Sequence, residues 1–142
     1  MQVRELMSTA VVTVDVEATL ADAAGKLLDA GVGSVVVVDA DGNPLGILTE
    51  SDVLEAARDT GSALQAIDVR DVGHRAVVTT TPSRAVTTAA RVMAKEGVKK
   101  VPVLDGVDLV GIVTLTDIVW ALPSLRAEAT GIEAVHEQWS PH

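Results

Sequence analysis

The sequence contains no cysteine, phenylalanine or tyrosine, and its two aromatic side chains of the Phe, Trp and Tyr class are Trp120 and Trp139. Without cysteine the chain forms no disulfide, no thiolate metal site and no cysteine nucleophile. Its core must be aliphatic, and 48% of the residues are hydrophobic. That fraction supports a packed fold rather than a disordered chain.

Basic residues are also few, since 11 Lys and Arg face 20 Asp and Glu and give a net charge of −9. Such a surface repels phosphate backbones, so we expect no nucleic-acid partner. No apolar run approaches the roughly 18 residues of a membrane helix, and the N-terminus lacks the basic-then-apolar pattern of a signal peptide. We therefore expect no membrane partner and a cytoplasmic location.

The sequence repeats itself. Residues 3–38 match residues 69–104 at an offset of 66 (69 − 3). The stretch GILTESD, at 46–52, then recurs as GIVTLTD, at 111–117, at an offset of 65 (111 − 46). Such self-similarity predicts a duplicated unit. We divide the 142 residues into a first repeat (3–68), a second repeat (69–127) and a C-terminal extension (128–142).

Each repeat has the predicted order β-α-β-β-α. A short β-rich run precedes a segment of helical periodicity, which ends at Gly31 or Gly97. A fully apolar run then predicts a buried strand, and a turn leads to a second strand that ends in the repeated motif. A second helix follows, and we expect Pro123 to end it in the second repeat. The predicted first runs are 11–14 and 77–80, the first helices 20–28 and 86–94, and the buried strands 35–38 and 101–104. We predict an α/β (α+β) fold whose two repeats pack sheet to sheet about a pseudo-twofold axis, because a half of this size is marginal alone.

The repeated motif has two interpretations. Thr and Asp at a strand-to-helix junction are typical helix caps. A helix N-terminus also binds anions, and an acidic residue beside it accepts from ribose hydroxyls in dinucleotide folds. The residues alone leave both interpretations open.

The two segments GVGSVVVVDADGNPLGILTESDVL and GVKKVPVLDGVDLVGIVTLTDIV resemble the halves of a cystathionine β-synthase (CBS) domain pair, or Bateman module, over about residues 3–122. The resemblance implies a stand-alone, non-catalytic regulatory sensor that needs no cofactor. Its regulatory ligand would be AMP, ADP, ATP or S-adenosylmethionine, bound in a cleft between the repeats.

The resemblance also assigns roles to individual residues. It implies that the second repeat binds ligand more strongly, because Gly33 and Ser34 stand in the first repeat where the second has lysines, and Val36 stands in place of Pro102. The implied ribose acceptors are Asp117 and Asp52, the phosphate ligands Thr114, Thr116, Thr49, Ser51, Lys99 and Lys100, and the adenine-pocket residues Ile112, Ile47, Thr13 and Thr79.

Other chemistry has little support. His74, His136 and His142 lack metal-ligand spacing, and residues 39–42 predict a hairpin turn rather than a calcium loop. No catalytic triad or glycine-rich phosphate loop is present, so we expect neither an enzyme nor a metal protein.

The C-terminal extension has apolar residues at 132, 135 and 139, which predict a short helix with an apolar stripe. The resemblance to the CBS family further implies a homodimer, which would regulate an effector protein that the sequence does not name. The rival hypothesis is a constitutive interaction and dimerisation module with vestigial clefts, in which the repeated Thr and Asp only cap helices.

Overall fold

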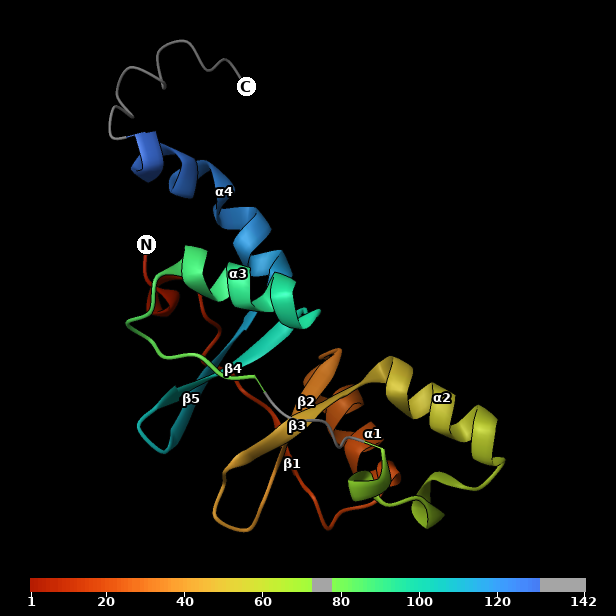
Figure 1. The fold of residues 1–142 in the computed structure, drawn as a ribbon. Helices are drawn as coiled ribbons and strands as arrows, with labels where there is room; N and C mark the ends of the chain where they lie inside the picture. The colour runs from red at the N-terminus through yellow and green to blue at the C-terminus, as the bar shows by residue number, and fades with distance from the viewer. Residues whose placement is uncertain (73–77, 131–142) are drawn as a thin grey trace.

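The computed structural model describes residues 1–72 and 78–130 (Figure 1). Short 3-10 turns at Val3–Glu5, Leu64–Ala66 and Val69–Asp71 lie outside the main elements. Those elements are β1 (Thr13–Asp15), α1 (Leu20–Ala30), β2 (Ser34–Val38), β3 (Pro44–Thr49), α2 (Glu50–Thr60), α3 (Val86–Glu96), β4 (Lys100–Asp105), β5 (Asp108–Thr114) and α4 (Leu115–Thr130).

Two small sheets form the centre of the molecule. In the first repeat β1 pairs parallel with β2, and β2 pairs antiparallel with β3. In the second repeat β4 pairs antiparallel with β5, while Thr80 forms a single parallel bridge to Val103. Figure 1 shows α1 and α2 on one side of the molecule and α3 and α4 on the other, with the sheets between them. The predicted fold class is confirmed.

Local sequence explains most of these elements. The α1 and α3 helices end at Gly31 and Gly97, whose positive φ angles of 64° and 67° are the left-handed conformation that glycine adopts at little cost. The apolar run Val35–Val37 is fully buried in β2, as predicted for a strand covered on both faces.

Equivalent hydrogen bonds show that the repeats are related by a pseudo-twofold axis. The N–H of Val3 donates to the carbonyl of Arg84, and the N–H of Val69 donates to the carbonyl of Ala18, both at 2.9 Å. These are the same bond seen from each repeat, since 69 follows 3 and 84 follows 18 by 66 residues. The segment that begins each repeat, at Val3 or Val69, therefore crosses to the other repeat and bonds to its backbone.

Each hydrophobic core contains a residue from the leading segment of the other repeat. Val69 and Ile67 pack into the core of the first repeat with Leu20 and Leu48, although Val69 opens the second repeat. Val3 packs into the core of the second repeat. Val3 and Val69 are both 0% exposed, so neither repeat completes its core without the other.

The structure corrects two predictions. Within the described residues, the strand predicted at 77–80 is reduced to the bridge at Thr80, and its mate at 11–14 begins only at Thr13. Pro123 does not end α4, which continues to Thr130 because Leu125 packs against the second core. Proline removes one helical hydrogen bond, and this tertiary contact offsets the loss. The helix predicted in the C-terminal extension lies outside the described residues.

Candidate functional site

The repeated Thr-x-x-Asp motif forms a capping box at each junction. Thr49 N–H donates to Asp52 Oδ2 at 2.8 Å, and Asp52 N–H donates to Thr49 Oγ1 at 3.2 Å. In the second repeat the corresponding distances for Thr114 and Asp117 are 2.9 and 3.1 Å. These bonds satisfy helix N-terminal donors, so the capping interpretation of the motif is realised in the structure.

Capping leaves part of each motif available for a ligand. The box uses Oδ2 of each aspartate, and no hydrogen bond of Oδ1 is found within the described part of the chain. The threonine hydroxyl accepts from the aspartate N–H and keeps its own proton to donate. Asp52 and Asp117 are half-buried, whereas Ser51 and Thr116 are exposed.

The residues just before β2 and β4 accept a hydrogen bond from one more donor of each helix. Glu50 N–H donates to the Gly33 carbonyl at 3.1 Å, and Leu115 N–H donates to the Lys99 carbonyl at 2.8 Å. In the first turn of α4 the N–H groups of Leu115 and Asp117 are thus engaged, and that of Thr116 is not among these bonds. A helix N-terminus with such a donor attracts anions.

Lys100 joins the two repeats between the capping boxes. Its Nζ donates to Ser34 Oγ at 3.0 Å, and Ser34 is the residue equivalent to Lys100 itself. In the sheet ladders Ser34 lies opposite Thr49, and Lys100 lies opposite Thr114. The half-buried ammonium group therefore sits centrally and reaches toward the first repeat.

This placement bears on the predicted difference between the two sites. The sequence assigned Lys99 and Lys100 to the Asp117 site, yet the Lys100 side chain extends to Ser34, and a Cβ on Gly33 would lie 3.8 Å from its Nζ. Lys99 is exposed. The positive charge is available to both repeats, and the ranking of the two sites stays a prediction.

Of the predicted adenine-pocket residues, Thr13, Ile47 and Ile112 lie on β1, β3 and β5, and Thr79 immediately precedes the bridge at Thr80. Ile47, Ile112, Thr13 and Thr79 are all partly buried. Ile47 alternates with the fully buried Leu48, which faces the helices, so Ile47 faces away from them. Thr79 lines a small hollow, and the other lining residues are Thr80, Arg84, Ala89, Val92 and Val101.

Sequence reasoning missed the role of Gly111. A Cβ at this position would lie 2.8 Å from Met7 Sδ and 2.9 Å from the Ser8 carbonyl oxygen. Ser8 runs along β5, exchanging two 2.9 Å hydrogen bonds with Ile112. The motif glycine of the second repeat thus makes room for the crossing N-terminal segment.

Sequence reasoning also passed over Thr80. This residue is 5% exposed, and its Oγ1 has no hydrogen-bond partner within the described residues. The signal was available, because the equivalent position in the first repeat is Val14, a purely apolar core residue.

The described residues hold no cluster of three or more His, Cys, Asp or Glu side chains arranged to bind a metal ion. Within the same residues no helix has both the length and the apolar character needed to cross a membrane.

Comparison with known proteins identifies the repeats. The CBS domain family matches residues 3–59 and again residues 69–124. The chain belongs to the CBS domain family. An uncharacterised protein of Methanopyrus kandleri is 32% identical over 126 residues, which is 88% of this chain. This CBS chain spans only 64% of that relative's length.

Solved CBS structures share the fold. The CBS domain pair of protein MJ0100, in complex with 5′-methylthioadenosine and S-adenosyl-L-methionine, has a TM-score of 0.76 at 26% identity, covering 87% of this chain and 97% of that one. A hexameric CBS-CP12 protein from bloom-forming cyanobacteria has a TM-score of 0.77 at 28% identity, covering 97% of this chain and 80% of that one. The CBS-pair architecture expected from the sequence is confirmed.

Proposed function

We propose that this CBS pair is a non-catalytic regulatory module that binds an adenosyl ligand between its repeats. The observation that carries the proposal is the pair of strand-to-helix junctions, each with a half-buried aspartate that keeps Oδ1 available, on either side of the Lys100 ammonium group. The ligands held by the MJ0100 domain pair support the adenosyl class. The binding experiment below decides which of AMP, ADP, ATP and S-adenosylmethionine is the ligand.

In this proposal each group has one task. Asp117 and Asp52 accept the two ribose hydroxyls through Oδ1, as acidic residues do in other nucleotide folds. The hydroxyls of Thr114, Thr116, Thr49 and Ser51 donate to phosphate, together with the Thr116 N–H and the lysines. Ile112, Ile47, Thr13 and Thr79 border the base.

Regulation follows if the ligand binds two arrangements of the protein with different affinities, because a ligand shifts an equilibrium only by that difference. Lys100 offers a route for such a difference. It bonds Ser34 of the other repeat in the described structure. A phosphate that takes over this ammonium group competes with a bond that connects the two repeats.

A set of three aspartate variants tests the proposal. The chain contains a third capping box, in which Thr19 N–H donates to Asp22 Oδ2 at 3.0 Å at the start of α1. Asp22→Ala is therefore a matched control for Asp117→Ala and Asp52→Ala. All three should cost about 1 kcal/mol of unfolding free energy, because each removes the same kind of cap.

Affinity should separate the three variants. Isothermal titration with AMP, ATP, S-adenosylmethionine and 5′-methylthioadenosine should show weaker binding for Asp117→Ala or Asp52→Ala and unchanged binding for Asp22→Ala. Equal stability losses with unchanged affinity in all three would mean that the aspartates serve only as caps. Failure of every adenosyl ligand to bind nucleotide-free protein would favour the rival module.

That rival, a constitutive interaction and dimerisation module, has one observation in its favour. Both capping boxes are complete without a ligand, so the repeated Thr-x-x-Asp spacing has a structural cause of its own. We further propose that the working unit is a homodimer, and the hexameric CBS-CP12 protein supports self-assembly of chains with this fold.

A further inference from the structure

Each repeat has a corner, formed by the turn before its first helix and the leading segment of the other repeat. The first corner comprises residues 15–22 and 69–71. The second corner comprises their equivalents at an offset of 66, residues 81–88 and 3–5. Because the pseudo-twofold axis relates the two corners, the first shows where the equivalent groups of the second lie.

The first corner contains an ion pair that connects the repeats. The guanidinium group of Arg70 contacts the carboxylate of Glu17. In the second corner the arginine is kept as Arg4, but Ser83 takes the place of the carboxylate. The second corner therefore has the cation of this pair without its anion.

Backbone hydrogen bonds hold Arg4 and Ser83 near each other. The N–H of Arg4 donates to the carbonyl of Pro82, and the N–H of Val3 donates to the carbonyl of Arg84, both at 2.9 Å. Ser83 lies between these two acceptor residues in the chain. Arg4 and Ser83 are both exposed, so their side chains are accessible to other molecules.

The second corner has lost its other carboxylates as well. Each acidic residue in the turn of the first corner is replaced by a residue with a hydroxyl group: Asp15, Glu17 and Asp22 correspond to Thr81, Ser83 and Thr88. In addition, Arg84 stands where the first repeat has Ala18. The turn at 81–88 thus carries a positive charge and no negative one, in a chain whose net charge is −9.

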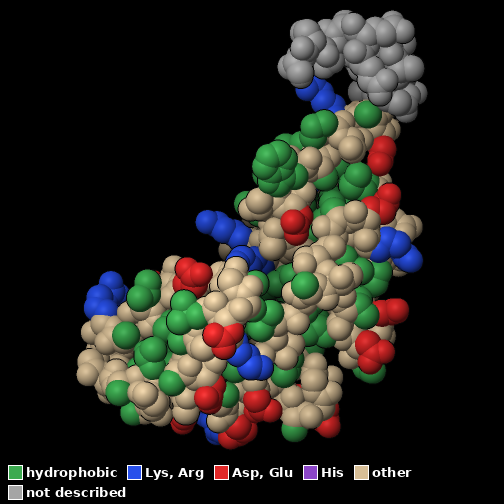
Figure 2. Space-filling view, turned by 180° about the vertical axis from the view of Figure 1, so that it is seen from behind, with side chains coloured by type: hydrophobic (Ala, Val, Ile, Leu, Met, Phe, Trp, Pro, Cys, Tyr) green, Lys and Arg blue, Asp and Glu red, His purple; other side chains and the backbone are tan. Residues whose placement is uncertain are grey.

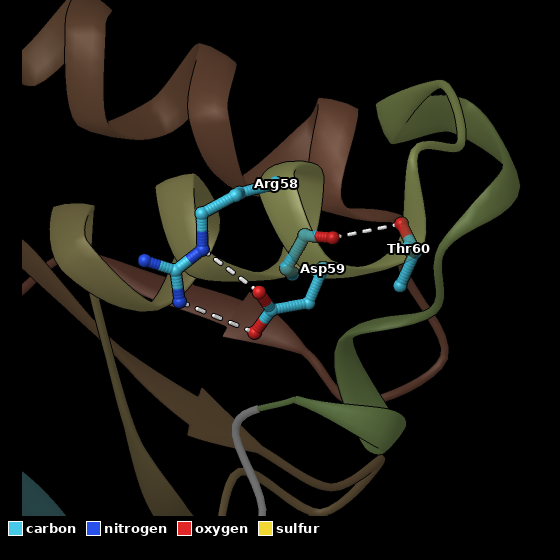
Figure 3. A network of polar contacts seen from close by, with 4 residues as sticks. Arg58, Asp59 and Thr60 are labelled. Carbon is cyan, nitrogen blue, oxygen red and sulfur yellow. Dashed lines mark hydrogen bonds and ion pairs between the residues drawn. The ribbon is translucent and has the colours of Figure 1, made fainter.

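Arg4 and Arg84 lack an acidic partner. By contrast, Arg58 at the end of α2 donates through Nε to Asp59 Oδ1 at 2.8 Å (Figure 3). On the face shown in Figure 2, Lys and Arg side chains lie scattered among Asp and Glu side chains. Within the described residues neither Arg4 nor Arg84 forms a salt bridge, and Glu5, which follows Arg4, accepts from a backbone N–H instead.

The second corner also leaves the N-terminus of α3 without a side-chain cap. At the start of α1 the Thr19 side chain accepts from the Asp22 N–H in a capping box. The N-cap residue of α3 is Ala85, and no side chain caps this helix. The first N–H groups of α3 and their partial positive charge therefore add to the charge of the two arginines.

We propose that Ser83 is a phosphorylation site and that the phosphorylated side chain pairs with Arg4. A protein kinase would transfer the terminal phosphoryl group of a nucleoside triphosphate to Ser83 Oγ. The new P–O bond forms as the bond to the nucleoside diphosphate breaks, and the hydroxyl proton is released. Phosphoserine carries a charge of about −1.5 to −2 and three acceptor oxygens, so it supplies the anion that Glu17 supplies in the first corner.

This proposal goes beyond the adenosyl site and does not depend on it. The α3 helix begins at the second corner and ends at Glu96, shortly before Lys99. Its 11 residues span about 16 Å. The modification would tie the leading segment to the second repeat from outside the ligand cleft, and its failure would leave the proposed ligand binding standing.

Phosphorus-31 nuclear magnetic resonance tests the pairing on the full chain with phosphoserine installed at position 83 during translation. The second pKa of this phosphoserine should lie below its usual value of about 6, because Arg4 stabilises the doubly ionised form. Arg4→Gln should return the pKa toward 6, whereas Arg70→Gln, in the first corner, should leave it unchanged. An unperturbed pKa without these substitutions, or equal effects of both, would overturn the pairing.

Mass spectrometry of the chain isolated from its own cells, growing and starved, tests whether the modification occurs. We expect a form that is heavier by one phosphoryl group, with the group on Ser83, and Ser83→Ala should abolish this form. Absence of the heavier form under both conditions would overturn the proposal. So would a phosphoryl group found only on the neighbouring Thr81.

Discussion

Replacing Thr80 with valine should stabilise the protein. The Thr80 side chain lies in the layer between the second sheet and α3, where its parallel bridge partner is the buried Val103. Its hydroxyl oxygen is buried and has no hydrogen-bond partner within the described residues. Valine has nearly the same shape and occupies the equivalent position 14 of the first repeat, where it is 1% exposed.

The magnitude follows from the cost of an unsatisfied hydroxyl. Burying a polar group without a partner costs about 1–3 kcal/mol, and the substitution removes that cost without opening a cavity. We expect Thr80→Val to raise the free energy of unfolding by about 1–2 kcal/mol. For a domain of this size that corresponds to a rise in Tm of roughly 4 °C per kcal/mol.

Urea unfolding monitored by circular dichroism measures this change through the transition midpoint. The reverse substitution Val14→Thr is the control, and it should lower stability by a similar amount because it creates the same unsatisfied group in the first repeat. Unchanged or reduced stability in Thr80→Val would show that the Thr80 hydroxyl has a partner, and the argument from its burial would be wrong.

Two further substitutions test the centre of the molecule. Gly111→Ala should lower the free energy of unfolding by about 1–3 kcal/mol in the same assay, because the added Cβ would lie under 3 Å from Met7 Sδ and from the Ser8 carbonyl oxygen. Unchanged stability would mean that the N-terminal segment does not lie along β5. Lys100→Ala should weaken ATP binding by about tenfold or more while leaving 5′-methylthioadenosine, which has no phosphate, unaffected, as titration calorimetry would show. Equal losses for both ligands would remove Lys100 from the phosphate site.

Much of the architecture could be predicted from the chain because its signals are local or repeated. Helix periodicity, the terminal glycines Gly31 and Gly97, and the apolar β2 run each predict an element without reference to distant residues. The duplication then predicts the twofold relation. Pro123 misled this reasoning, because its local cost is offset by a contact of Leu125 that lies in another part of the fold.

The sequence predicts which motif residues form the candidate site, but not which residues of the two repeats meet there. The motif supplied Asp52 and Asp117, and their capping bonds follow from sequence spacing alone. The meeting of Lys100 with Ser34 could not be predicted, because these residues are 66 positions apart in the chain and adjacent only across the pseudo-twofold axis.

The sequence by itself determined that there are two units, how each is built and where its helices are capped, because these depend on neighbours within a few residues. Only the tertiary structure decided that Val3 and Val69 complete each other's cores, and that Gly111 makes room for the crossing segment. It also decided that the outward face of α4 lacks cover. Each of these outcomes depends on which surfaces meet after the chain has folded, and a burial of that kind leaves no local pattern in the order of residues.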